Sequence, residues 1–162
     1  MTGVQTCALP IYILTSGKSS RLYAALVDQQ QLATSVGSYY EQSFDPTLFQ
    51  FYAIASKDVD ESKIEKALYD EIEKIKKEGI TEKELQKIKN QKLMEFYNQV
   101  ETINGKSNNI GTYEVFFGDY RKMFNAPEAY NKVTTEDVKK MSVKYLLKST
   151  RTVGILKSNV ED

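Results

Sequence analysis

The stretch EGITEKEL, residues 78–85, decides how the chain folds, because it ends one helix and begins the next. Gly79 stands where helices commonly end in a residue with left-handed backbone geometry. Thr81 and Glu84 have the spacing of a capping box, in which each side chain accepts a hydrogen bond from the other residue's backbone N–H. The stretch therefore predicts two successive helices joined by a short connection.

The sequence on both sides of this connection has helical periodicity. Asp60 can cap a helix over residues 61–78. The apolar face of that helix consists of Ile64, Leu68, Ile72 and Ile75. Beyond the capping box, the pattern predicts a helix that lasts until Asn104-Gly105 and a shorter helical stretch that ends near Gly118.

Two predicted strands precede these helices. Residues 34–41 are rich in β-branched and aromatic side chains, which favour strands. Residues 48–56 (LFQFYAIAS) are largely apolar at both alternating sets of positions, so we expect a strand covered on both faces, within the chain or by a partner. The turn cluster SFDPT at residues 43–47 separates the two, which makes an antiparallel hairpin the default arrangement.

Further signals lie towards the two ends of the chain. Ser19 or Ser20 can cap a helix that runs to about Gln31. Residues 134–137 (TTED) repeat the cap spacing and open another helix. Residues 150–157 (TRTVGILK) then predict a closing strand.

The predicted order is helix, strand, strand, four helices and a strand. This order defines an α+β fold: a two-layer sandwich with a mainly antiparallel sheet and helices packed on one face. At 162 residues, the chain has the size of one domain. We divide it into residues 1–11, a domain over residues 12–157 and a polar tail over residues 158–162.

Residues 1–11 (MTGVQTCALPI) resemble one translated reading frame of a common sequencing adapter, and we interpret them as non-native. A signal peptide is the competing interpretation, but no Lys or Arg precedes the apolar stretch, which is also short. On the adapter interpretation Cys7 and Pro10 carry no functional meaning, and the native domain is truncated upstream of Tyr12. Loss of its first strands would expose a sheet edge, so we expect the free fragment to aggregate.

The composition excludes several kinds of active site. The sequence contains no histidine, which removes His-dependent triads, His general bases and His-ligated zinc. With one cysteine, it holds neither an intrachain disulfide nor a Cys metal cluster. Lys plus Arg and Asp plus Glu each number 22, so the zero net charge gives no reason to expect nucleic acid or an anionic membrane as a partner. No apolar run is long enough for a membrane span.

Side chains that could suggest a function have a simpler structural interpretation. Arg21 is expected to have a packing or ion-pair role on the surface of its helix. Glu71, Glu95 and Glu101 lack the convergent spacing of a loop that holds a hard cation. The mixed Lys/Glu runs of the long helices are expected to be solvated faces stabilised by pairs four residues apart.

Taken in order, several of these stretches resemble the second, C-terminal half of the pitrilysin/insulinase family of zinc peptidases, which includes the mitochondrial processing peptidases. No single piece is specific, and the resemblance rests on their order and spacing from about Tyr12 to Leu156. The pieces are Ile13-Leu14 with GKSSRLY at 17–23, the strand at 48–56, EGIT with Glu84-Leu85, VTTEDV at 133–138 with Lys144-Tyr145-Leu146, and Val153.

The resemblance implies two similar halves that face each other around a closed chamber. It places the zinc on the first half, in a His-x-x-Glu-His helix with a distant Glu, and normally no metal on the second. In active members the second half supplies an Arg and, seven residues later, a Tyr, which bind the substrate backbone and the developing oxyanion. Here those positions hold Val27, which cannot donate a hydrogen bond, and Thr34, which is too short to replace a phenol without a shifted backbone. The resemblance therefore implies no catalytic, cofactor-binding or metal-binding residue in this chain, and zinc only on the partner half.

Three functional hypotheses follow from the resemblance. In the first, the chain is a non-catalytic C-terminal domain that closes a peptide-binding chamber and packs against a zinc-bearing half, in cis or in trans. In the second, it is an inactive scaffold or core-type subunit of a larger complex. In the third, it belongs to an active peptidase in which other groups replace the Arg/Tyr pair. None makes the chain an enzyme by itself, and the family likeness implies an exported or periplasmic location in a bacterium.

Overall fold

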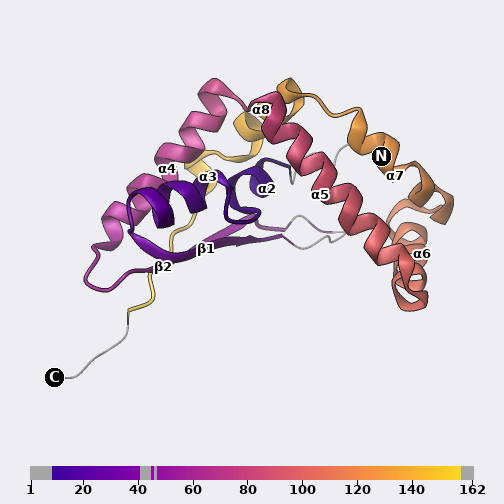
Figure 1. Cartoon of the computed structure of the whole chain (residues 1–162), viewed down its shortest axis with the longest axis horizontal. Coiled ribbons are helices and arrows are strands. Elements are labelled where there is room, and N and C mark those ends of the chain that lie inside the picture. Colours follow the sequence, from indigo (N-terminus) through magenta and orange to yellow (C-terminus); the bar gives the residue numbers. More distant parts are fainter. Residues whose placement is uncertain (1–8, 41–44, 46, 158–162) are drawn as a thin grey trace.

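The computed structural model describes residues 9–40, 45 and 47–157 (Figure 1). Helices lie over one side of a short sheet, and a helical extension continues away from it (Figure 1). The elements are α2 (Leu9–Thr15), α3 (Arg21–Tyr23), the π-helix η1 (Ala24–Gln29), β1 (Ala33–Tyr39), β2 (Gln50–Ala55), α4 (Glu61–Glu78), α5 (Glu82–Glu101), α6 (Ile103–Phe117), the 3₁₀ helix η2 (Tyr120–Asn125), α7 (Ala126–Asn131), α8 (Thr135–Tyr145) and the 3₁₀ turn η3 (Lys148–Thr150). The expected α+β class is confirmed, with more helix and a smaller sheet than the sequence predicts.

The connection between α4 and α5 has the predicted geometry. Gly79 ends α4 with a φ of 78°, and its N–H donates to the carbonyl of Ile75. Thr81 caps α5, and both hydrogen bonds of its capping box with Glu84 are present. Asp60 caps α4 by accepting a hydrogen bond from the backbone N–H of Ser62. Local signals therefore set both ends of α4 and the start of α5.

The sheet is an antiparallel pair in which Val36 lies opposite Ala53 and Gly37 lies opposite Tyr52. Val36, Phe51 and Ala53 point to the side covered by the helices and pack against the core. Within the described chain β2 packs on one face only, so the prediction that the chain itself covers both faces of residues 48–56 is wrong. Cover of the second face by a partner stays a prediction. The hairpin's turn cluster lies mostly outside the described residues.

The main core lies between the inner face of the sheet and the helices. It is built from α2, α3, η1, α4, α5 and α8. Its fully buried aliphatic side chains are Leu9, Leu14, Leu22, Leu26, Ile75, Leu85 and Val138. A second, smaller cluster of Tyr113, Met123 and Ala126 holds the helical extension of α6, η2 and α7 against α5.

The helix predicted to run from Ser19 or Ser20 to about Gln31 forms, but most of it is a π-helix. Ser20 occupies the N-cap position, yet its side chain makes no capping hydrogen bond. The helix widens at Ala24, and the chain leaves it through Gln31, which has a left-handed φ of 52°. Sequence periodicity cannot distinguish this wider helix from an α-helix over so few residues.

The helix predicted to last until Asn104-Gly105 ends earlier, at Glu101. Thr102 adopts an extended backbone, and its side chain accepts a hydrogen bond from the N–H of Gly105 to cap α6. The sharp bend brings Gly105 so close to the carbonyl of Gln99 that a Cβ atom would overlap it. A local cap therefore overrides the continuous helical pattern.

The closing strand predicted over residues 150–157 does not form. Residues 151–157 are exposed and adopt no regular structure. Arg151 instead lies over the ring of Tyr69, 3.5 Å from its centroid, and Lys157 forms an ion pair with Glu61. Both contacts hold the segment along α4, and it pairs with neither β1 nor β2.

Helix α2 includes part of the segment that we interpret as non-native. Leu9 and Ile11 are each only 2% exposed, and Leu9 packs in the main core beside Leu14. The boundary at residue 11 stays a prediction. Residues 1–8, including Cys7, and the polar tail 158–162 lie outside the described part of the chain.

Candidate functional site

The face of the sheet opposite the helices is the broadest candidate for a binding surface. We call it the outer face; it consists of Ser35, Gly37, Tyr39, Gln50, Tyr52 and Ile54. These positions share one side because side chains alternate along a strand and the two strands pair in this register. Tyr39, Tyr52 and Ile54 are 54%, 54% and 58% exposed. None of the six side chains carries a charge.

Gly37 leaves room for the aromatic ring of Tyr52 on this face. A Cβ atom at Gly37 would lie 2.9 Å from a ring carbon of Tyr52, and closer still to its hydroxyl. The ring of Tyr52 therefore covers the backbone of the neighbouring strand while its other side remains open. Glycine in a strand commonly marks such a close approach.

The two positions singled out by the family likeness lie on neighbouring elements. Val27 belongs to η1 and packs partly buried against the main core. Thr34 is exposed where the register shifts between Ala33 and Ser35, and its hydroxyl donates to the carbonyl of Ile54 at 3.3 Å. Thr34 therefore borders the outer face, whereas Val27 supports the helix layer. The replacement of the family's Arg and Tyr at these positions stays a prediction.

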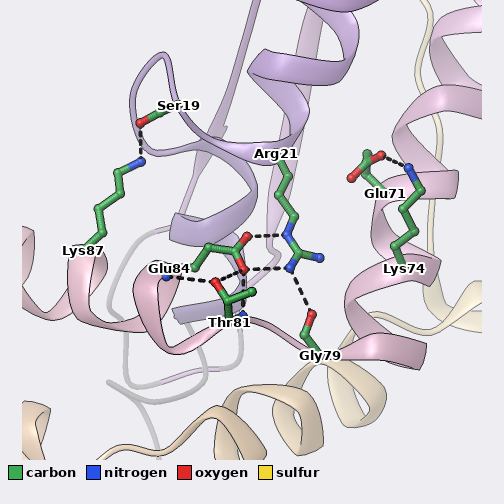
Figure 2. Close-up of polar contacts among 8 residues, drawn as sticks. All are labelled: Ser19, Arg21, Glu71, Lys74, Gly79, Thr81, Glu84 and Lys87. Atoms are coloured by element: carbon green, nitrogen blue, oxygen red, sulfur yellow. Dashed lines mark hydrogen bonds and ion pairs between the residues drawn. The ribbon is translucent and has the colours of Figure 1, made fainter.

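Arg21 has the ion-pair role expected of it (Figure 2). Its Nε donates to Glu84 Oε1 at 2.6 Å and its Nη2 to Glu84 Oε2 at 2.9 Å. The same Nη2 donates to the carbonyl of Gly79 at 3.1 Å. One guanidinium thus joins α3 to both sides of the α4–α5 connection. This arrangement indicates that Arg21 makes a structural contact and does not form a ligand site.

The electrostatics of this contact centre on Glu84. The Arg21 guanidinium, helped by hydrogen bonds from Thr81, lowers the pKa of the Glu84 carboxyl to about 2. The hydrogen bond to Glu84 in turn raises the pKa of Arg21 above its usual value. The sequence pattern identified Glu84 as a capping residue, but it contained no signal for a partner so distant along the chain.

The three acidic side chains considered as a cation site are already paired or dispersed. Glu71 on α4 binds Lys74, and Glu95 on α5 binds Lys92 at 2.7 Å. Glu101 stands at the end of α5. Within residues 9–40, 45 and 47–157, no group of three or more His, Cys, Asp or Glu side chains is placed to hold a metal ion. No helix in the same ranges is both long and apolar enough to cross a membrane.

Comparison with known proteins identifies the family to which this domain belongs. Residues 10–92 match the family described as the Peptidase M16 inactive domain. The chain belongs to this family, and the likeness to the C-terminal, non-zinc-binding half of zinc peptidases is confirmed.

Individual relatives agree with this assignment. The chain is 31% identical over 117 residues to the zinc protease PqqE of Helicobacter pylori. A solved protease from Helicobacter pylori superposes with a TM-score of 0.80 at 25% identity, over 89% of this chain. The inactive peptidase domain of a Bordetella parapertussis protein, provisionally described as a zinc protease, gives a TM-score of 0.82 at 25% identity, over 95% of this chain and 83% of that one.

The chain corresponds to only part of the longer relatives. Its match covers 26% of PqqE and 34% of the solved Helicobacter protease. By contrast, it covers 84% of a solved chain from Bordetella pertussis Tohama I, also provisionally described as a zinc protease, with a TM-score of 0.82 at 25% identity. The fold is therefore that of one inactive domain.

Proposed function

We propose that this domain is the non-catalytic half of a zinc peptidase and closes a peptide-binding chamber by packing against a zinc-bearing half. Membership of the inactive-domain family supports this role, as do the zinc protease names of its relatives. The longer relatives contain much sequence beyond the matched part, which leaves room for such a half in cis. A separate subunit could supply it in trans.

The open outer face is the observation that carries the proposal. One side of the sheet packs against helices, whereas Tyr52 and Ile54 on the other side remain more than half exposed. An exposed surface with apolar and aromatic side chains is typical of a site that another molecule covers. A second half placed opposite this sheet would turn the outer face into a chamber wall.

In this proposal the zinc ion belongs to the companion half. There it would polarise the scissile carbonyl and activate the attacking water. The residues of this domain would exclude bulk water and present a surface to the peptide, and they would take no part in proton transfer. The domain would thus affect hydrolysis through binding and enclosure.

The proposal is tested on the protein in which this domain and its zinc-bearing half are expressed together. Deletion of residues 12–157 should abolish peptide hydrolysis while one equivalent of zinc per assembly remains bound to the companion. The companion's zinc content, measured by atomic absorption, is the control for its folding. Undiminished hydrolysis after the deletion would overturn the proposal.

The exposed helix α6 favours a second candidate, an inactive scaffold subunit. Ile103, Ile110 and Val115 are exposed along this helix, and Tyr113 is its one buried residue. A helix that exposes several apolar side chains and buries so few is suited to contact a partner subunit. If the native assembly contains no zinc and hydrolyses no peptide, yet dissociates when Ile103 and Ile110 are replaced by Asp, the scaffold is the better account.

A further inference from the structure

Helix α6 carries an apolar stripe that is exposed along most of its length. Ile103, Ile110 and Phe117 are spaced seven residues apart, so they lie along one side of the helix. Ile103 is 86% exposed and Ile110 is 43% exposed. Phe117 is partly buried, with its ring 5.1 Å from that of Tyr113 in the smaller core cluster. We call these three positions the α6 stripe.

Two opposite charges flank the centre of the α6 stripe. Lys106 and Glu114 each lie four residues from Ile110, on the same side of the helix, and both are exposed. Neither forms an ion pair within the described part of the chain. Arg121 lies nearby, but its hydrogen bond to Asp119 is the main cause of its raised pKa, to which Glu114 adds a minor part. Both flanking charges are therefore available to a partner.

The stripe and its charges are complementary to themselves. If a second α6 lies antiparallel with Ile110 facing its own counterpart, residues at equal distances on either side of this position face each other. Lys106 then faces Glu114 of the copy, and Ile103 faces Phe117 of the copy. Because a two-fold axis repeats each pair, one helix face supplies a continuous apolar seam and two ion pairs. A parallel copy would place like charges opposite each other.

The position of α6 determines what such a contact would join. The helix packs against α5 and η2, and it lies in the helical extension, away from the sheet (Figure 1). A contact through α6 would therefore leave the outer face free for a companion half. Because a helix of 15 residues is about 22 Å long, the contact is smaller than most stable interfaces and belongs to the weak class.

From these observations we propose that α6 is a self-association surface, which pairs antiparallel with α6 of a second copy of this chain. The α6 stripe forms the apolar seam, and Lys106 and Glu114 set the direction of the pair. The contact joins two assemblies and closes neither chamber. The inference goes beyond the proposed function and does not rest on it, because it concerns the oligomeric state and not hydrolysis.

The first test is sedimentation velocity of the full assembled protein over a range of concentrations. We expect its mass to double with a micromolar Kd, and Ile110→Asp to raise that Kd at least tenfold. Val115→Asp is the matched control, because Val115 is 62% exposed on the same helix but lies about 140° around it from Ile110. Its Kd should be unchanged. A mass that does not depend on concentration, or equal effects of the two substitutions, would overturn the inference.

The second test exploits the charges. Lys106→Glu or Glu114→Lys places two like-charged pairs in the contact, so each variant alone should self-associate about tenfold more weakly. An equal mixture of the two variants should associate with nearly the original Kd, because every facing pair is again of opposite sign. A mixture that associates no more tightly than its components would mean that the surface does not pair with a second copy.

One substitution in this test could disturb the fold. Glu114 Oε2 accepts the backbone N–H of Tyr120 at 3.0 Å, and Glu114→Lys removes that acceptor. If this variant does not fold, Glu114→Gln replaces it, because its amide oxygen can still accept the N–H. Its mixture with Lys106→Glu should still associate more tightly than Lys106→Glu alone.

The outcomes distinguish this inference from the proposed function. If Ile110→Asp abolishes the doubling of mass and leaves hydrolysis unchanged, the inference is supported and the proposed function is unaffected. If Ile110→Asp separates this domain from its companion half, the companion covers the α6 stripe and the inference is overturned. If hydrolysis persists without the domain, the proposed function fails, whereas the sedimentation results still decide the inference.

Discussion

Arg21 binds Glu84 through two nitrogen atoms, across 63 positions of sequence. Glu84 Oε2 also accepts the backbone N–H of Thr81 at 2.8 Å, so the carboxylate that completes a helix cap also anchors a distant helix. Forked arginine–carboxylate contacts are among the stronger polar interactions in proteins because both hydrogen bonds are charge-assisted. The contact fixes the helix that carries Val27 against the long helices of the domain.

Replacement of Arg21 by Gln should lower the stability of the α4–α5 connection. The side chains of Arg21 and Glu84 are 20% and 29% exposed, so solvent screens the pair only in part. We expect a loss of about 1–3 kcal/mol. Hydrogen exchange of the first amides of α5 in the full protein measures it.

Arg121→Gln is the matched control for this measurement. Arg121 pairs with nearby Asp119 on the surface, and 74% of its side chain is exposed. Its replacement should leave the same amides unchanged. Equal effects of the two substitutions would show that the Arg21 contact adds nothing beyond a surface charge.

The contact should also make stability depend on pH in the acid range. The folded-state pKa of Glu84, about 2, lies below its ordinary value of 4.5, so the stabilising charge is fully present above pH 4.5. It is lost as the pH falls through the folded-state pKa. The stability difference between the unsubstituted protein and Glu84→Gln should therefore be constant above about pH 5 and shrink progressively as the pH falls from there towards 2. Acid unfolding of both proteins gives this difference, and one that stays constant between pH 5 and pH 2 would contradict the pairing.

Two glycines of α6 should respond oppositely to alanine. At Gly105 a Cβ atom would lie 2.8 Å from the carbonyl carbon of Gln99, so Gly105→Ala must displace the backbone and destabilise the bend. At Gly111 nothing lies within 4 Å, so Gly111→Ala should stabilise the helix by about 0.5–1 kcal/mol. Thermal unfolding of the full protein distinguishes them. A gain of stability in both would argue against the tight bend at Thr102.

The C-terminal segment should be released when its aromatic contact is removed. Tyr69→Leu eliminates the ring under Arg151, an interaction worth about 0.5–1 kcal/mol at exposed sites. Trypsin cleavage after Arg151 should then become about two- to fivefold faster. Tyr120→Leu alters a more distant ring contact, 6.0 Å from Arg121, and should not change that rate. Equal cleavage rates with and without Tyr69 would mean that other contacts hold the segment.

Local signals account for the parts of the fold that the sequence predicted well. The capping boxes at Thr81 and Thr134 depend on residues three positions apart, so their hydrogen bonds do not depend on the tertiary fold. The segment 150–157 shows the opposite case. Its composition favours a strand, but a strand requires an edge to pair with, and contacts to α4 hold this segment elsewhere.

The candidate site was harder to predict for the same reason. Apolar residues at both alternating sets of positions in 48–56 indicated two covered faces, but only the fold reveals which of them packs against helices. Tyr52 contacts Gly37, and Arg21 contacts Glu84. Both contacts join segments that are far apart in sequence. Neither has a signature in the spacing of nearby residues.

The central claim is that this domain acts on peptides only together with a zinc-bearing half. Its most direct test compares the zinc-bearing half expressed alone with the same half co-expressed with this domain, both assayed on one fluorogenic peptide at equal total zinc. The account predicts hydrolysis by the co-expressed pair and none by the zinc-bearing half alone. Full hydrolysis by the zinc-bearing half alone, unaffected by co-expression of this domain, would contradict it.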